Sequence, residues 1–318
     1  MKKFLLKILL FASILTAFAY IIDICISKGL ISMSDYRFQT WNEISKNEIN
    51  ADLLINGNSR GLSHYVPSVF DSVLNTNSYN IGFGGHPFNA EYLKYHYYIS
   101  HNKIPKVLIQ NVDFLTLSDI FVIGHEREQI LPFVKDTYLR KHLPDYGFNL
   151  FEIYIPLVRY FGYQKEIKNG LFEKFGLKHY FNTTSEKGFL PEKGVWDPTE
   201  LNKIEKIPFD KDSFSVDLFI KYLSELKNDN VKVFLVNSPV YYKATEKLEE
   251  KAEMYEFYSE IARRFGFIYL DYTSDSLCFD STMFVKAVHM NKTGAVKFSK
   301  KLASDLRKYK LDDLITRK

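Results

Sequence analysis

The chain alternates short apolar runs with segments of helical spacing. Five runs are rich in β-branched and aromatic residues, and turn-forming residues bound each of them. Strands that alternate with helices form βαβ units with right-handed crossovers, which build a parallel sheet. We therefore predict an α/β fold with a doubly wound, three-layer, five-stranded parallel sheet. The predicted strands are Leu53–Gly57, Tyr79–Phe83, Lys106–Val112, Val231–Asn237 and Phe267–Asp271.

The N-terminal segment is apolar over a length that suits a membrane. From Phe4 to Ile26 it is long enough to cross a bilayer, which needs about 20 helical residues, although Asp23 interrupts it. Flanking lysines predict a cytoplasmic N-terminus and an extracytoplasmic body, periplasmic or extracellular. Ala17-Phe18-Ala19 also resembles a signal-peptidase site, so residues 1–27 are a membrane anchor or a signal peptide. We favour the anchor because apolar sequence continues beyond that site.

The rest of the chain divides into a connector and a large domain. Residues 28–50 form a mixed polar and aromatic connector, and residues 51–318 form the α/β domain. The interval of about 116–211, between the third and fourth strands, is far longer than one crossover helix needs. We predict that it forms a mainly helical cap over the carboxyl edge of the sheet, with a helical stretch at Asp145–Phe161. A surface elaboration with its own small core is the alternative. A last helix is predicted over Lys292–Tyr309.

Composition narrows the class of protein. The 318 residues are 46% hydrophobic, which is enough for a large core. A net charge of +4 comes from 42 basic and 38 acidic residues without blocks of like charge, which argues against nucleic-acid binding. The two cysteines, Cys25 and Cys278, lack the neighbours of a metal site, and no phosphate-loop or dinucleotide motif is present. We therefore predict neither a metal nor a cofactor.

Two residues far apart in the chain are candidates for nucleophilic chemistry. Ser59 follows the first predicted strand in a Gly-Asn-Ser turn, and a serine at the carboxyl edge of such a sheet lies in the ligand crevice. The turn alone fits equally well an ordinary helix start with Ser59 as N-cap. His289 precedes the last helix, which returns it to the same edge, and a serine nucleophile needs an imidazole to accept its proton. We predict that the two side chains meet.

Three short blocks of sequence surround these candidates. They are Gly57-Asn58-Ser59-Arg60, Tyr79-Asn80-Ile81-Gly82-Phe83-Gly84-Gly85 and His289-Met290-Asn291-Lys292-Thr293-Gly294-Ala295. In this order they resemble the SGNH/GDSL hydrolase superfamily, with Asn58 in place of the usual aspartate. The resemblance covers about residues 52–305 without the cap. It points to the membrane-anchored, exported branch found beside bacterial envelope-polysaccharide genes, and it implies an SGNH or flavodoxin-like sheet.

The resemblance also implies a division of roles. Ser59 would be the nucleophile, His289 the general base, and the backbone N–H groups of Ser59 and Gly85 would stabilise the oxyanion. Arg60 is alternatively an ordinary residue of the helix surface. The residues expected on the oxyanion and substrate side are Gly85, Asn58, Arg60 and Asp113.

Two positions depart from the family pattern. The third strand ends Gln110-Asn111-Val112-Asp113 where the family has Gly-x-Asn-Asp, so the third oxyanion donor is not matched, although Asn111 or Asp113 is still placed to face the cleft. The family's aspartate three residues before the histidine is Lys286 here, and a positive charge lowers the pKa of an imidazole. Three alternatives follow: Asp280 or Asp271 orients His289, the enzyme uses a Ser-His dyad, or catalysis is reduced or lost.

The sequence as a whole leads to one functional prediction and one alternative. We predict an exported serine esterase or O-acyltransferase that acts on acyl esters of a cell-envelope carbohydrate. The expected partners are that carbohydrate or a small acyl ester, the membrane through the N-terminal helix, and a membrane-bound acyl donor. The alternative is an SGNH-fold binding or assembly factor for envelope polysaccharide that has lost its catalytic machinery.

Overall fold

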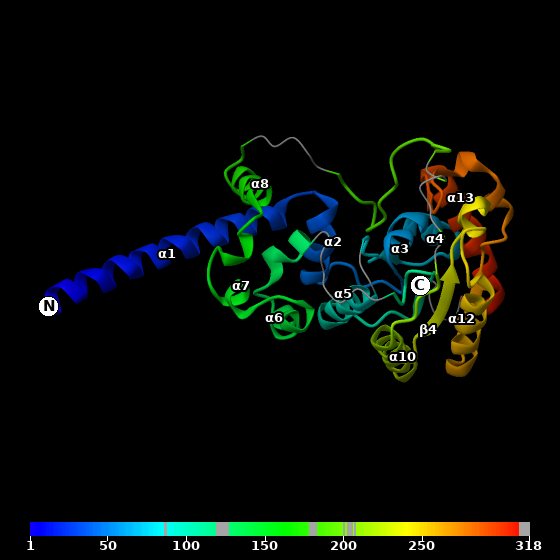
Figure 1. The fold of residues 1–318 in the computed structure, drawn as a ribbon, viewed down its shortest axis with the longest axis horizontal. Coiled ribbons are helices and arrows are strands. Elements are labelled where there is room, and N and C mark those ends of the chain that lie inside the picture. Colours follow the sequence, from blue (N-terminus) through cyan, green and yellow to red (C-terminus); the bar gives the residue numbers. More distant parts are fainter. Residues whose placement is uncertain are drawn as a thin grey trace. The chain divides into compact units, whose positions relative to one another are not determined.

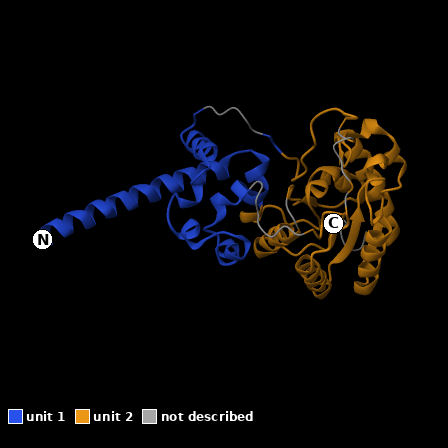
Figure 2. Cartoon of the chain, viewed as in Figure 1, with its two compact units in different colours: residues 1–43, 122–184 blue, residues 44–121, 185–318 orange. Residues whose placement is uncertain are grey.

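The computed structural model describes residues 1–85, 88–118, 127–177, 183–199, 201, 206 and 208–311. The chain forms two compact units, each built from two separate stretches (Figure 2). Unit 1 comprises residues 1–43 and 122–184, and unit 2 comprises residues 44–121 and 185–318. Unit 2 contains the sheet, and unit 1 contains the apolar N-terminal helix.

Unit 2 is built on a five-stranded parallel sheet with the order β2-β1-β3-β4-β5. The predicted α/β class is confirmed, and all five predicted strands are present with slightly different ends. Every residue of the first three strands is buried, which explains why they are continuous apolar runs rather than alternating ones. The strands are β1 (Leu53–Asn56), β2 (Ser78–Asn80), β3 (Val107–Asn111), β4 (Lys232–Asn237) and β5 (Ile268–Asp271).

Helices pack on both faces of this sheet. On one face, α4 (Pro67–Leu74) and α13 (Lys292–Leu306) bury their apolar sides in one cluster with strand residues such as Ile55 and Ile109. On the other face, ring contacts such as Phe88–Phe219 and Phe219–Tyr258 join three further helices. Those three helices are α5 (Phe88–His101), α10 (Ser213–Asn228) and α12 (Lys251–Phe265).

The remaining short elements of unit 2 lie between these helices and strands. The predicted last helix is confirmed: α13 ends at Leu306 and a 3₁₀ turn continues it to Tyr309. Just before α13, two short antiparallel strands form a hairpin. The short elements are α3 (Ser59–His64), α11 (Tyr242–Thr245), β6 (Phe284–Lys286), β7 (His289–Met290), η5 (Ser276–Phe279), η6 (Ser281–Met283) and η7 (Arg307–Tyr309).

Unit 1 is helical in the part that the structure describes. Its centre includes Trp41, which is fully buried, stacks on Phe133 and donates a hydrogen bond to the side chain of Gln129. Its elements are α1 (Lys2–Ser32), most of α2 (Tyr36–Ser45), η1 (Arg127–Gln129), η2 (Leu131–Phe133), α6 (Thr137–His142), η3 (Leu143–Tyr146), α7 (Leu150–Tyr154), η4 (Val158–Tyr160) and α8 (Gln164–Lys174).

The helix α1 has an exposed apolar part and a packed part. Its N-terminal stretch is long and apolar enough to span a membrane. Its C-terminal stretch crosses α8 so closely that a Cβ on Gly29 would collide with the carbonyl of Gly170. Figure 1 shows the N-terminal stretch projecting away from α7 and α8.

The predicted division of the chain differs from the two compact units. Residues 122–184 of the predicted cap group with residues 1–43, whereas residues 185–211 group with the sheet. The connector predicted at residues 28–50 is likewise divided, because α1 continues to Ser32 and α2 follows. Cap residues 119–126, 178–182, 200, 202–205 and 207 lie outside the described part. The location of the cap over the sheet edge stays a prediction.

The single helical stretch predicted at Asp145–Phe161 is wrong. The structure contains α7, which covers only Leu150–Tyr154, and 3₁₀ turns before and after it. Pro156 interrupts the helical hydrogen bonding, and Leu157 adopts a left-handed conformation with φ +67°. The apolar spacing was real, but it did not reflect one continuous helix.

Candidate active site

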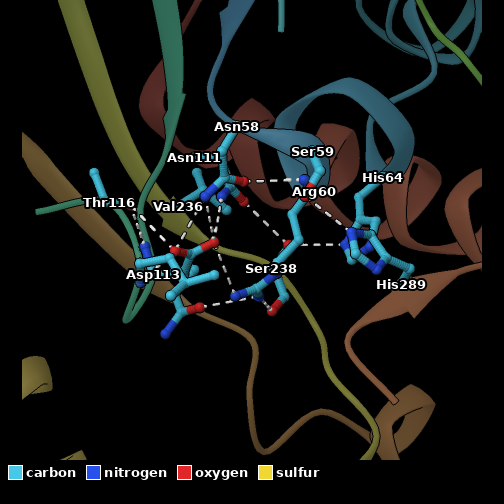
Figure 3. Close-up of polar contacts among 12 residues, drawn as sticks. Asn58, Ser59, Arg60, His64, Asn111, Asp113, Thr116, Val236, Ser238 and His289 are labelled. Carbon is cyan, nitrogen blue, oxygen red and sulfur yellow. Dashed lines mark hydrogen bonds and ion pairs between the residues drawn. The ribbon is translucent and has the colours of Figure 1, made fainter. Parts of the chain in front are cut away.

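Ser59 lies in the first turn of α3, directly beyond the carboxyl end of β1 (Figure 3). Gly57 makes this turn possible: its φ is +149°, and a Cβ there would lie 2.7 Å from the Cβ of Asn111. Asn58, rather than Ser59, is the N-cap, because its side-chain oxygen accepts a hydrogen bond from the N–H of Arg60 at 3.0 Å. The hydroxyl of Ser59 is therefore left for other contacts.

Ser59 and His289 are in hydrogen-bond contact. The Nε2 of His289 lies 2.9 Å from the Oγ of Ser59, although 230 positions separate them in the chain (Figure 3). His289 begins β7, and Asn291, the N-cap of α13, follows almost at once. The chain thus returns the imidazole to the edge where β1 ends, and the two side chains meet as the sequence predicted.

The other nitrogen of this imidazole lacks a hydrogen-bond partner among the described residues. The Nδ1 of His289 is buried and makes no hydrogen bond to any residue that the structure describes. Asp271 accepts hydrogen bonds from Thr273, and Asp280 accepts them from Thr282. Both carboxylates are therefore engaged in local turns, and the prediction that one of them orients His289 is wrong.

Lys286 faces His289 across the β6–β7 hairpin, where the two residues are register partners. Burial lowers the pKa of His289 to about 4, and the positive charges of Arg60 and Lys286 act in the same direction against the opposing effect of Asp113. The imidazole is therefore neutral at neutral pH. When the hydroxyl of Ser59 donates a hydrogen bond to Nε2, Nε2 is the acceptor nitrogen. The single proton of the neutral ring is then on Nδ1.

A second histidine supports the loop that carries the first. His64, at the end of α3, is fully buried, and its Nε2 accepts a hydrogen bond from the backbone N–H of Met290 at 3.0 Å. Its Nδ1 must then carry the proton, which it donates to the Oγ of Ser238 at 2.9 Å. Burial, and then Arg60 and His289, hold the pKa of His64 well below its usual range. A neutral His64 thus fixes the backbone directly after His289.

The floor of the site is a buried cluster around Asp113. Its carboxylate accepts hydrogen bonds from the side-chain amide of Asn58 at 3.1 and 3.0 Å and from the N–H of Leu115 at 2.9 Å. The guanidinium of Arg60 lies 3.3 Å from the same carboxylate and also donates to the side chain of Asn237 at 3.1 Å. The cluster links the ends of β1, β3 and β4.

This burial corrects the prediction that Asn58, Arg60 and Asp113 contact substrate. The three residues are only 7%, 3% and 1% exposed, and they bond to one another beneath Ser59. Arg60 is also not an ordinary helix-surface residue, because its polar partners hold it inside. The structure gives the three residues a supporting position rather than a place on the open side of the site.

The predicted oxyanion loop passes close to Ser59. The N–H of Phe83 donates to the carbonyl of Gly57 at 2.8 Å, which extends the pairing beyond the end of β2. A Cβ on Gly84 would lie 3.7 Å from both Cα and Cβ of Ser59, so the loop backbone is near the hydroxyl. Gly85 follows with φ +73° and is exposed. Its role as an N–H donor stays a prediction.

These residues gather where ligands bind in many α/β folds. β1 lies between β2 and β3. The chain therefore runs from β1 toward one edge of the sheet and from β2 back toward the other edge. In such sheets the crevice outside the carboxyl ends of the strands, at this reversal of order, is the usual binding position. Ser59 follows β1, and Asp113 follows β3. The pair Ser59–His289 is therefore at the topologically favoured place.

Within the described ranges, no group of three or more His, Cys, Asp or Glu side chains is arranged to hold a metal ion. In comparisons with known proteins, no protein-family model and no curated protein sequence matches this chain. The chemistry of the site must therefore be argued from its geometry.

Sequence reasoning missed most of the support beneath the pair. His64, Ser238 and Asn111 form a chain of hydrogen bonds, since the Oγ of Ser238 donates to the side chain of Asn111 at 3.1 Å. The sequence predicted that Asn111 or Asp113 faces the cleft, but it did not indicate the hydrogen bonds that join His64, Ser238 and Asn111, because a lone histidine on a short helix looks like any buried histidine. Ser238 lies on the loop after β4, and tertiary contacts decide its position relative to α3.

Proposed function

We propose that the protein is a serine-dependent acyl-transfer enzyme, an esterase or an O-acyltransferase, with Ser59 as nucleophile and His289 as general base. The observation that carries this proposal is the 2.9 Å contact between the Oγ of Ser59 and the Nε2 of His289. Hydroxyl and base are within the range needed for proton transfer. The neutral state of the imidazole leaves Nε2 able to accept the proton.

The proposed reaction proceeds through an acyl-enzyme. The Oγ of Ser59 attacks an acyl carbonyl while its proton passes to the Nε2 of His289, and the imidazolium then protonates the departing alcohol. Water or a sugar hydroxyl attacks the acyl-serine, and Nε2 takes up its proton and returns it to Ser59. The N–H groups of Ser59 and Gly85 are the proposed donors to the oxyanion, worth about 3 kcal/mol for one donor.

The site corresponds to a dyad rather than a triad. An imidazolium formed during the reaction would place its Nδ1–H where the described residues offer no acceptor. Loss of the orienting aspartate lowers turnover by about four orders of magnitude in a triad protease. We therefore expect slow chemistry, in which substrate contacts and the oxyanion donors supply much of the rate enhancement.

The proposed location and substrate rest on the N-terminal helix and on the sequence resemblance. We propose that α1 crosses the membrane with its lysine-bearing end in the cytoplasm and that the rest of the protein lies outside. The resemblance to the SGNH/GDSL superfamily points to acyl esters of an envelope carbohydrate. A membrane-bound acyl donor is the proposed partner if the acceptor is a sugar hydroxyl.

The proposal is tested by covalent labelling of the full-length protein in detergent with a fluorophosphonate probe. Wild-type protein is expected to be labelled, and Ser59→Ala is expected to lose labelling completely. His289→Gln should slow labelling by about 10²–10⁴-fold, the usual contribution of a general base. The matched control is Ser68→Ala, which removes a partly exposed serine on the neighbouring helix α4. Undiminished labelling of Ser59→Ala would exclude Ser59 as the nucleophile.

A second candidate function is a non-catalytic binding or assembly factor for envelope polysaccharide. Two features favour it because both weaken the imidazole as a base: the Nδ1 of His289 has no hydrogen-bond partner in the described part of the chain, and position 286 is a lysine. This function predicts that the wild-type protein binds polysaccharide, releases no acyl group and does not react with the probe. Probe labelling at Ser59 would exclude it.

A further inference from the structure

Unit 1 exposes a group of large apolar side chains that begins in α7 and continues through η4 to the residue after it. Phe161 is 90% exposed and Phe151 is 66% exposed, values that are unusual for aromatic side chains in a folded protein. Six such residues lie within twelve positions of one another, and we name them the apolar rim. The apolar rim is Leu150, Phe151, Tyr154, Ile155, Val158 and Phe161.

Contacts with α1 show which residues of that helix lie beside the apolar rim. The hydroxyl of Tyr20 donates to the carbonyl of Tyr154 at 3.3 Å. The carboxylate of Asp23 accepts a hydrogen bond from the N–H of Leu157 at 3.0 Å and pairs with Arg159 at 2.7 Å. The rim therefore lies beside residues 20–23 of α1, at the point where the helix becomes exposed.

A further pair of exposed apolar side chains in unit 1 follows α8. Glu166 lies 3.4 Å from Arg37, which follows the end of α1, and Gly170 packs against Ile26. The helix α8 therefore packs against the C-terminal stretch of α1. Phe175 and Leu177, both exposed, follow the C-terminal end of α8.

The length of the exposed part of α1 matches the bilayer. At about 1.5 Å per residue, the helix from Phe4 to Ile22 is about 29 Å long, and the hydrocarbon core of a bilayer is about 30 Å thick. Asp23, the next residue, is fully buried and paired with Arg159 and Lys135. If this part crosses the membrane, as we proposed above, the apolar rim lies at the membrane surface, because it is beside residues 20–23 of α1.

We propose that the apolar rim inserts into the interfacial layer of the lipid bilayer and seats unit 1 on the membrane around α1. Aromatic side chains favour this layer, and basic side chains extend from it. Lys135 fits this position, because its ammonium lies 5.3 Å from the ring of Tyr20 while it pairs with Asp23 at 2.9 Å. The inference rests on the proposed membrane crossing by α1.

The test places an environment-sensitive NBD fluorophore on single cysteines of the full-length protein in vesicles of phosphatidylcholine and phosphatidylglycerol. The background carries Cys25→Ser, and Cys278 is buried. Phe161→Cys and Phe151→Cys report the rim, and Ile14→Cys reports the middle of the exposed helix. Ser34→Cys is the matched control, because Ser34 is exposed in the same unit beyond the opposite end of α1.

Lipids that carry a spin label near the headgroup are expected to quench both rim positions at least twofold more strongly than position 34. Iodide in the aqueous phase should quench position 34 most. If position 14 is protected from iodide while both rim positions behave like position 34, the rim inference fails although the helix crosses the membrane. If position 14 is also open to iodide, the proposed crossing fails and the rim inference fails with it.

Discussion

At the residue scale, the candidate site combines a well-placed base with an unfavourable electrostatic setting. The Nε2 of His289 contacts the hydroxyl of Ser59, yet the position across the hairpin, Lys286, carries an ammonium instead of a carboxylate. The positive charges of Arg60 and Lys286 add to the effect of burial and lower the pKa of His289 to about 4. Below that pH the imidazole is protonated and cannot accept the proton of Ser59.

Lys286→Asp is expected to raise the pKa of His289 and to increase the rate of probe labelling at neutral pH. The substitution removes a positive charge and adds a negative one opposite the ring, which favours the imidazolium by about one pKa unit or more. The rate in the wild-type protein should fall as the pH drops through about 4. In the variant this fall should occur at a higher pH. The measurement is the labelling rate constant between pH 3.5 and 8.

Lys286→Gln is the matched control for this substitution. It removes the ammonium without adding a carboxylate, so the pH at which the rate falls should move less than in Lys286→Asp. Lys286 is exposed and its side chain can change without disturbing the core. Identical pH profiles in all three proteins would show that position 286 does not tune the imidazole.

At the element scale, one buried carboxylate joins α1 to the segment between α7 and η4. Asp23 is fully buried, and Arg159, its main partner, has only 1% of its side chain exposed. The same carboxylate accepts the N–H of Leu157, a residue in the left-handed region. Non-glycine residues are strained there and keep this conformation only when their surroundings enforce it. Asp23 thus neutralises the charge of Arg159 and holds the backbone of the segment between α7 and η4.

Asp23→Asn is expected to destabilise this part of unit 1 by about 3–5 kcal/mol, the usual effect of breaking a buried ion pair by removing one partner. The buried guanidinium of Arg159 would be left without a counter-charge. The measurement is hydrogen exchange of the amides of residues 150–174 in detergent, which should become much faster.

Glu152→Gln is the matched control within the same unit. Glu152 pairs with Arg127 at 2.8 Å, but both side chains are partly exposed, and such pairs are worth about 0–1 kcal/mol. Glutamine also preserves the capping box that Glu152 forms with Asn149. Equal exchange rates in Asp23→Asn and Glu152→Gln would show that Asp23 has no special part in holding unit 1 together.

At the scale of the whole molecule, the buried His64 couples the stability of unit 2 to pH. Burial holds the pKa of His64 in the folded chain well below its ordinary value of 6.5. The unfolded chain binds a proton there below about pH 6.5 and the folded chain does not, so the free energy of unfolding decreases as the pH falls. At pH 5 the loss from this group is expected to be at most about 2 kcal/mol.

His64→Gln is expected to reduce this pH dependence. The measurement is urea unfolding of the wild type and the variant at pH 7 and pH 5 in the same detergent. The variant should be less stable at pH 7, because the N–H of Met290 loses its imidazole acceptor, but it should lose less on acidification. A direct check is the NMR signal of the His64 ring, which should not titrate between pH 8 and pH 5. Parallel pH dependences would contradict the assignment.

The sequence allowed the sheet and the central pair of the site to be predicted, because both follow from local patterns and from topology. Buried apolar runs identified the strands, and a histidine before the last helix necessarily returns to the edge where Ser59 lies. The chemistry behind the imidazole was only partly accessible. Lys286 indicated the missing acid, but Asp271 and Asp280 are held by their own turns, which spacing does not reveal.

The organisation of unit 1 was not predictable from local patterns. Apolar spacing at residues 145–161 resembled one helix, whereas Asp23 stabilises a bend there at Leu157. The contact between Gly29 and Gly170 likewise depends on two glycines far apart in the chain, and nothing near either one indicates its partner. Such long-range pairings decide which stretches of an insertion form a unit.

The discontinuity of unit 1 sets an order for its assembly during synthesis. Asp23 and Arg159 are 136 positions apart, so the carboxylate leaves the ribosome long before the guanidinium exists. Until Arg159 is made, α1 therefore carries an unneutralised acid at Asp23, directly after its apolar part. By the time Arg159 emerges, β1, β2 and β3 of unit 2 have already been made. The ion pair that joins the two stretches of unit 1 can therefore form only after three strands of the sheet have been synthesised.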